Sequence, residues 1–134
     1  MNQERVRLEM PRIPLISIVD DDDALRCALE NLMRSAGLLA QGFSSAEAFL
    51  RSEQRHETDC LIIDMRMPGM SGLELQRQMA FANSHIPIIF ITAYEADQRR
   101  TQALETGAAA FLYKPFHEGE LLNAIDAALK DSKD

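Results

Sequence analysis

The sequence has only two cysteines and no apolar run long enough to cross a membrane. A membrane-spanning helix needs about 20 consecutive apolar residues, so no such helix is expected in this sequence. Cys27 and Cys60 lack the close spacing of metal-binding cysteine motifs, which predicts free thiols in a cytoplasmic protein. Arg5 and Arg7 are followed by no apolar segment, so no cleavable secretory signal is predicted.

An excess of positive charge is also missing. The 21 acidic residues outnumber the 14 basic ones, and the formal net charge is -7. Nucleic-acid binding needs a basic patch that displaces counterions from phosphates, and anionic membranes attract basic segments. We therefore expect no direct binding to nucleic acid and no membrane attachment. The 134 residues, 46% of them apolar, suit one domain with a hydrophobic core.

Apolar segments and helical patterns alternate five times along the chain. Strands are predicted at 15–19, 38–43, 60–64, 88–91 and 109–113, and helices at 25–36, 44–50, 71–79, 96–106 and 121–129. Gly37 and Gly107 suit the ends of the first and fourth helices. This alternation predicts an α/β fold in which helices cover both faces of a parallel sheet.

Two Ser–Glu pairs have the spacing of a capping box, which closes the start of a helix. Ser44 and Glu47 precede the second helix, and Ser71 and Glu74 precede the third. The polar segment 51–59 is predicted to connect the second helix to the third strand. We divide the chain into a flexible leader (1–12), one domain (13–130) and the start of a linker or tail (131–134).

Polar side chains follow or end four of the five predicted strands. Asp20 and Asp21 follow the first strand, Asp64 ends the third, Thr92 follows the fourth and Lys114 follows the fifth. These ends share one edge of a parallel sheet, where ligands of such folds bind. Three neighbouring carboxylates repel one another, and a hard cation such as Mg²⁺ relieves that repulsion. With a lysine added, the site suits a phosphoryl group.

Each of these residues also has an ordinary structural explanation. Asp22 and Asp23 would stabilise a helix N-terminus through its dipole, and the two acids before them could belong to the same solvated start. Thr92 could be one more β-branched strand residue, and Lys114 could lie on the surface. Taken singly, these explanations match or outweigh the functional ones. The combination at the ends of the appropriate strands favours a shared site.

Four motifs resemble the receiver domain of bacterial response regulators. Residues 18–21, 63–72, 91–93 and 111–116 read IVDD, IDMRMPGMSG, ITA and FLYKPF. Their details resemble the FixJ-type branch, whose members usually carry a LuxR-like helix-turn-helix output. The resemblance covers residues 13–130 and implies a flavodoxin-like fold of five strand–helix units with strand order 2-1-3-4-5.

The resemblance implies a magnesium site. Asp64 would be the phosphoacceptor and would bind Mg²⁺ together with Asp21 and the backbone carbonyl of Arg66. Asp20 would assist through a water molecule.

The resemblance also assigns the residues around the phosphoryl group. Lys114 would pair with the acyl phosphate, and Thr92 would bond to it and move inward. Phe111 would be the aromatic switch residue, although it lacks the hydroxyl that many members have there. The Lys114–Pro115 peptide would be cis.

Access to the phosphate would be bordered by Arg66 and Tyr94, neither of which is well suited to orienting an attacking water. The segment 93–96 departs from the Gly-rich, His-containing turn of the FixJ-type branch.

The implied function is a phosphorylation-dependent switch rather than an enzyme. A sensor histidine kinase would donate the phosphoryl group, and the face of the fourth helix, fifth strand and fifth helix would change and form a homodimer. The output would be transcription, through a DNA-binding domain of a longer regulator from which this chain was cut. The alternative is a Mg²⁺-dependent phosphatase that forms an aspartyl phosphate, which requires a second acid where Arg66 stands.

Overall fold

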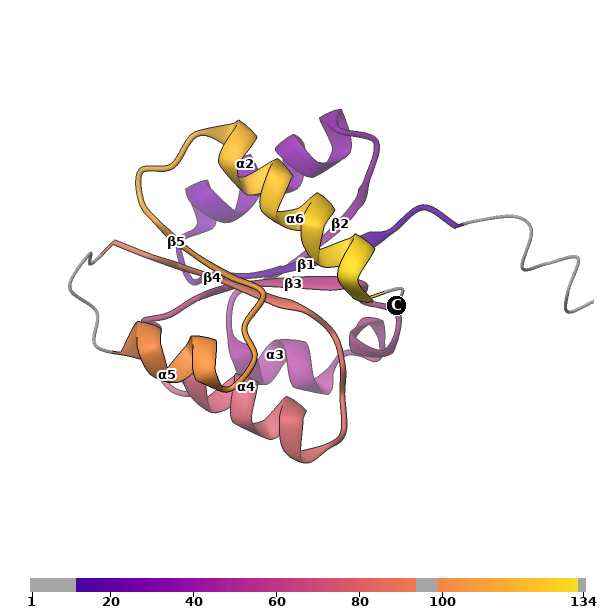
Figure 1. The fold of residues 1–134 in the computed structure, drawn as a ribbon. Helices are drawn as coiled ribbons and strands as arrows, with labels where there is room; N and C mark the ends of the chain where they lie inside the picture. Colours follow the sequence, from indigo (N-terminus) through magenta and orange to yellow (C-terminus); the bar gives the residue numbers. More distant parts are fainter. Residues whose placement is uncertain (1–11, 94–98, 133–134) are drawn as a thin grey trace, which may run out of the picture.

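The computed structural model describes residues 12–93 and 99–132 of the chain. Five parallel strands form one sheet in the order β2-β1-β3-β4-β5 (Figure 1), which confirms the predicted strand order. They are β1 (Leu15–Val19), β2 (Leu39–Phe43), β3 (Cys60–Asp64), β4 (Ile88–Thr92) and β5 (Ala110–Tyr113). The helices that connect them bring all five carboxyl ends to the same edge.

Helices cover both faces of the sheet. They are α2 (Asp23–Ser35), α3 (Ala46–Arg51), α4 (Gly72–Phe81), α5 (Arg99–Glu105) and α6 (Glu118–Ser132), with a 3-10 turn, η1 (Glu53–His56), after α3. Figure 1 shows α2 and α6 on one side of the sheet and α3, α4 and α5 on the other. No helix in the described part of the chain is long and apolar enough to cross a membrane.

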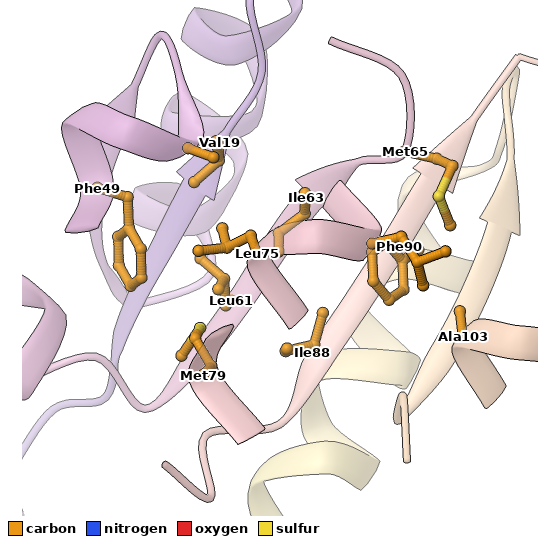
Figure 2. Close-up of a cluster of buried hydrophobic side chains, with 12 residues drawn as sticks. Val19, Phe49, Leu61, Ile63, Met65, Leu75, Met79, Ile88, Phe90 and Ala103 are labelled. Carbon is orange, nitrogen blue, oxygen red and sulfur yellow. The ribbon is translucent and has the colours of Figure 1, made fainter. Parts of the chain in front are cut away.

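Successive residues of a strand point to opposite faces, so the sheet divides the hydrophobic core in two. The cluster under α3, α4 and α5, which we call the α3–α5 core, includes Phe49, Ile63, Met65, Leu75 and Phe90 (Figure 2). The cluster under α2 and α6 is called the α2–α6 core. It includes Ile18, Met33, Ile62, Ile91 and Leu121.

The central strands β1, β3 and β4 are buried along their whole length, whereas the outer strands β2 and β5 contain half-buried residues. This difference explains why continuous apolar runs mark the central strands in the sequence. It also explains why β2, with its sequence LAQGF, is less apolar than the central strands.

The capping box predicted from Ser44 and Glu47 is wrong. Ser45 is the N-cap of α3, and its hydroxyl accepts a hydrogen bond from the backbone N–H of Ala48 at 3.0 Å. The Glu47 carboxylate instead accepts a hydrogen bond from the backbone N–H of Met70, 23 positions further along the chain. Sequence spacing alone does not distinguish a glutamate that caps its own helix from one that reaches another loop.

Other predicted element ends agree more closely with the structure. The capping box of Ser71 and Glu74 is present at the start of α4. Gly37 and Gly107 follow α2 and α5 with positive φ angles of 83° and 108°, as their predicted role requires. The polar connection 51–59 contains η1, which the sequence analysis did not predict.

Candidate functional site

Three aspartates meet at the carboxyl edge of the sheet. Asp20 and Asp21 follow β1, and Asp64 ends the neighbouring strand β3, where Val19 pairs with Ile63. One carboxylate oxygen from each aspartate lies within 4.8 Å of the other two. Asp20 and Asp64 are buried and Asp21 is exposed, so the group forms a pocket that opens to solvent on one side.

Asp20 is the most enclosed of the three, with 0% of its surface exposed. Its Oδ1 accepts a hydrogen bond from the backbone N–H of Asp22 at 2.9 Å, whereas its Oδ2 is buried without a hydrogen-bond partner among the described residues. Burial raises the pKa of Asp20 to about 6, and the negative charges of Asp64 and Asp21 act in the same direction. The site therefore disfavours three simultaneous negative charges unless a cation is bound.

Lys114 supplies a positive charge inside this acidic pocket. Its Nζ lies 3.1 Å from Oδ2 of Asp64 and 3.7 Å from Oδ2 of Asp20. The backbone N–H of Lys114 donates to the carbonyl oxygen of Thr92 at 2.7 Å, which places the start of the β5–α6 loop beside the end of β4. The Lys114–Pro115 peptide is cis, as the resemblance predicts.

The β3–α4 loop, residues 65–71, begins directly at the central carboxylate. The backbone N–H of Arg66 donates to Oδ1 of Asp64 at 3.0 Å, and that of Met65 donates to the carbonyl oxygen of Ile91 at 2.8 Å. At the far end of the loop, a Cβ added to Gly72 would lie 2.9 Å from the carbonyl oxygen of Asp64. These contacts keep the main chain of Arg66 next to the Asp64 carboxylate.

Thr92 and Phe111 lie on the two strands beyond β3. Thr92 is fully buried at the end of β4, one residue beyond the position that pairs with Asp64. Phe111 is half-buried in β5, and its ring centroid lies 6.0 Å from that of Phe90 and 5.7 Å from that of Tyr113. Phe111 thus belongs to an aromatic row that continues into the α3–α5 core.

The remaining acids of the DDDD run have structural positions. Asp22 is the N-cap of α2, and its carboxylate accepts a hydrogen bond from the backbone N–H of Leu25 at 3.1 Å. Asp23 lies in the first turn of α2 and pairs with Arg26 at 2.6 Å. Both therefore serve the helix start, as the sequence analysis predicted for them.

Arg26 is a site neighbour that the sequence analysis missed. Its Nη1 donates to the carbonyl oxygen of Asp20 at 2.7 Å, so its guanidinium group holds the turn that carries the first two acids. The i, i+3 spacing of Asp23 and Arg26 could have indicated the surface ion pair. The contact with Asp20 has no comparable sequence signal.

Tyr94, which was predicted together with Arg66 to border the phosphate, lies outside the described residues.

The pocket fits a hard divalent cation such as Mg²⁺. Its converging ligand atoms are all carboxylate oxygens. Oδ2 of Asp20 is buried and has no hydrogen-bond partner within residues 12–93 and 99–132. Mg²⁺ prefers oxygen ligands and commonly keeps several waters, which the exposed side at Asp21 can admit.

Comparison with known proteins agrees with the fold. Residues 16–126 match the model of the response regulator receiver domain. The chain is 47% identical over 128 residues to the response regulator protein TodT of Pseudomonas putida, covering 96% of this chain and 56% of TodT. It is 37% identical over 120 residues to the transcriptional regulatory protein FixJ of Azorhizobium caulinodans, covering 90% of this chain and 57% of that protein.

Solved structures show the same similarity. The response regulator StyR superposes with a TM-score of 0.85 and 43% identity, covering 91% of this chain and 62% of StyR. The structure of FixJ-N superposes with a TM-score of 0.81 and 32% identity, covering 90% of this chain and 96% of that one. The chain spans a little over half the length of the curated relatives described above. The chain belongs to the response regulator receiver domain family, in the FixJ-type group of two-component signalling proteins.

Proposed function

We propose that this domain is a switch that a sensor histidine kinase turns on by transferring a phosphoryl group to Asp64. The observation that carries the proposal is the placement of Lys114 Nζ 3.1 Å from Asp64, within a group of three aspartates. A carboxylate at this point can act as a nucleophile while a cation and a lysine neutralise the phosphoryl oxygens. Surface acids that only start a helix would need no contact with a partly buried lysine.

In the proposed reaction, a carboxylate oxygen of Asp64 attacks the phosphorus of a phosphohistidine. The new O–P bond replaces the P–N bond, and the electron pair of that bond leaves with the histidine ring. The Arg66 N–H, 3.0 Å from Oδ1, restrains rotation of the Asp64 carboxylate. Lys114 exchanges its contact with Asp64 for one with a phosphoryl oxygen. Thr92, at the end of the next strand, donates its hydroxyl to another.

Asp21, Asp64 and the backbone carbonyl of Arg66 would hold Mg²⁺, and Asp20 would assist through a water molecule. The bound cation would neutralise charge on the phosphoryl group. Arg66 and Tyr94 would border the path of water to the phosphate, and their lack of a carboxylate or amide favours slow hydrolysis. In this proposal the domain is not an enzyme with a separate substrate. It catalyses only its own phosphorylation and dephosphorylation.

The output is proposed to pass through the face formed by α5, β5 and α6, which corresponds to the fourth helix, fifth strand and fifth helix of the sequence analysis. Thr92 and Phe111 flank this face, so a small motion at the phosphate could shift its packing. We expect a homodimer through this face after phosphorylation. The regulated output is proposed to be transcription in the cytoplasm, through a DNA-binding domain of a longer protein.

The phosphatase alternative is less well supported. Arg66 stands where that class needs its second acid, and the relatives reported above are named as regulators. A switch accumulates one phosphoryl group per molecule, whereas a phosphatase releases many phosphates from its substrate.

The direct test is phosphorylation of the purified domain with acetyl phosphate and Mg²⁺, followed by intact mass measurement. We expect the mass of one phosphoryl group on the wild type and on Asp22→Asn, which keeps the helix cap. We expect no added mass on Asp64→Asn. Undiminished labelling of Asp64→Asn would refute the proposed acceptor, and continuous release of phosphate without labelled protein would favour the phosphatase.

A further inference from the structure

Glu47 connects the start of α3 to the loop that carries the phosphoacceptor site. It lies in the first turn of α3, yet its Oε2 accepts a hydrogen bond from the backbone N–H of Met70 at 3.0 Å. Ser45, not Glu47, caps α3. The Glu47 carboxylate is therefore directed to the β3–α4 loop rather than to the N-cap of its own helix.

The loop packs closely against this carboxylate. Gly69, next to Met70, has a φ angle of 75°, which favours glycine, and a Cβ added there would lie 2.8 Å from Oε2 of Glu47. The backbone N–H of Glu47 itself and that of Met70 lower the pKa of the Glu47 carboxyl. The carboxylate is thus a charged acceptor, and hydrogen bonds to charged groups are stronger than those between neutral groups.

The two ends of the loop are held by local contacts. Arg66 bonds to Asp64 at the beginning, and the capping box of Ser71 and Glu74 closes the end. Between them, the Glu47 bond ties the loop to a different part of the chain. Without it, the segment between Arg66 and Ser71 would be held only by its two ends and by the packing of Met67 and Met70, so the Arg66 carbonyl would gain freedom.

We propose that Glu47 is a positioning residue that holds the β3–α4 loop so that the Arg66 carbonyl stays in place for Mg²⁺. This inference rests on the proposed function, in which the Arg66 carbonyl of the β3–α4 loop binds Mg²⁺. Glu47 itself is not a ligand in this proposal. Its effect passes through the backbone N–H of Met70.

The test compares three variants. Glu47→Ala removes the acceptor, Glu47→Gln keeps a neutral acceptor, and Ser45→Ala weakens the N-terminus of α3 without touching the loop. The first readout is amide hydrogen exchange of Met70, measured by NMR on the metal-free protein. The second is the Kd for Mg²⁺, measured by calorimetry. Glu74, whose N–H bonds to Ser71, serves as an internal reference amide.

We expect Met70 to exchange roughly tenfold faster in Glu47→Ala, a change of the size expected for one lost hydrogen bond to a charged group. We expect the Kd for Mg²⁺ to rise about fivefold in Glu47→Ala and less in Glu47→Gln, by the same reasoning. Ser45→Ala should lower the melting temperature but leave both readouts unchanged.

Two results would overturn the inference. If Met70 exchanges equally slowly in Glu47→Ala and the wild type, the hydrogen bond does not hold the loop. If Ser45→Ala weakens Mg²⁺ binding as much as Glu47→Ala does, Glu47 only stabilises α3. Failure of the proposed function would be separate, because the wild type would then show neither Mg²⁺ binding nor labelling at Asp64.

Discussion

The two faces of the sheet hold different parts of the acidic pocket. The α3–α5 core takes in Met65 from the β3–α4 loop, with Met67 and Met70 packed against it. The α2–α6 core is bordered instead by Leu25, just after the β1 acids, and by Phe116, just after Lys114. The loop after Asp64 is thus anchored in one core. The segments that follow Asp20 and Lys114 contact the other core, whereas Val19 and Phe111, which precede them, lie with the first.

This difference divides the loops around the pocket between the two cores. The β3–α4 loop and the segments that follow Asp20 and Lys114 are supported by separate sets of side chains, and the sheet lies between those sets. A disturbance in the α3–α5 core should therefore displace mainly the β3–α4 loop. A disturbance in the α2–α6 core should displace mainly the segments that follow Asp20 and Lys114.

The largest expected effect comes from a matched pair of core methionines. Met65 and Met33 are both fully buried, in the α3–α5 core and the α2–α6 core respectively. Each Met→Ala variant should lower the free energy of unfolding by about 2–5 kcal/mol, measured by urea denaturation. Met65→Ala should also weaken Mg²⁺ binding, because Met65 lies between Asp64 and Arg66. Equal loss of Mg²⁺ affinity in Met33→Ala would disprove the separation.

The next effect depends on pH. The raised pKa of Asp20, about 6, means that the folded metal-free protein binds the proton more tightly than the unfolded chain, in which the pKa has its ordinary value of 3.8. Stability should therefore fall as the pH rises between these values, and the penalty should be complete above about pH 6. Asp20→Asn should stabilise the metal-free protein at pH 7.5 by at most about 3 kcal/mol and have little effect at pH 3. Thermal unfolding at both pH values, without metal, is the measurement.

A smaller effect should distinguish the neighbouring acids Asp21 and Asp22. Asp22→Ala removes the N-cap of α2 and should lower the free energy of unfolding by about 1 kcal/mol, with Mg²⁺ affinity retained. Asp21→Ala should weaken Mg²⁺ binding and leave stability nearly unchanged, because Asp21 is exposed. Calorimetric titration and urea denaturation of both variants would check this, and parallel losses of metal affinity would contradict it.

The smallest effect is expected on the outer surface of α6. Lys130 and Asp126 form an exposed i, i+4 ion pair at 3.0 Å. Lys130→Ala should change the free energy of unfolding by no more than about 0.5 kcal/mol, and less at high salt. Urea denaturation at low and high salt is the measurement. A larger loss, or any change in Mg²⁺ affinity, would show that this surface is coupled to the pocket.

The sequence was most informative where local chemistry decides the structure. Gly37 and Gly107 marked helix ends because the positive φ angles there favour glycine. Runs such as CLIID marked strands because burial on both faces demands continuous apolar side chains. The convergence of Asp20, Asp21 and Asp64 followed from the parallel topology, since their strand ends must share one edge.

The failures concern contacts between distant parts of the chain. Glu47 was assigned to its own helix because Ser-x-x-Glu spacing is a local pattern, whereas its contact with Met70 exists only after α3 and β3 have packed together. The contact of Arg26 with the Asp20 carbonyl was missed for a related reason. The turn after β1 must be folded before the arginine can reach that oxygen.

The pairing of β1 with β3 has a consequence for folding. This ladder joins Ile16 to Cys60, and it closes a longer stretch of chain than any other ladder of the sheet. Asp21 and Asp64 meet only when it forms, so an unfolded or partly folded chain has no assembled cation site. A cation that binds only the completed pocket therefore stabilises the folded state. At concentrations well above its Kd, the free energy of unfolding rises with the logarithm of the cation concentration. The strand pairing that is entropically hardest to form is the one that the ligand of the pocket would reinforce.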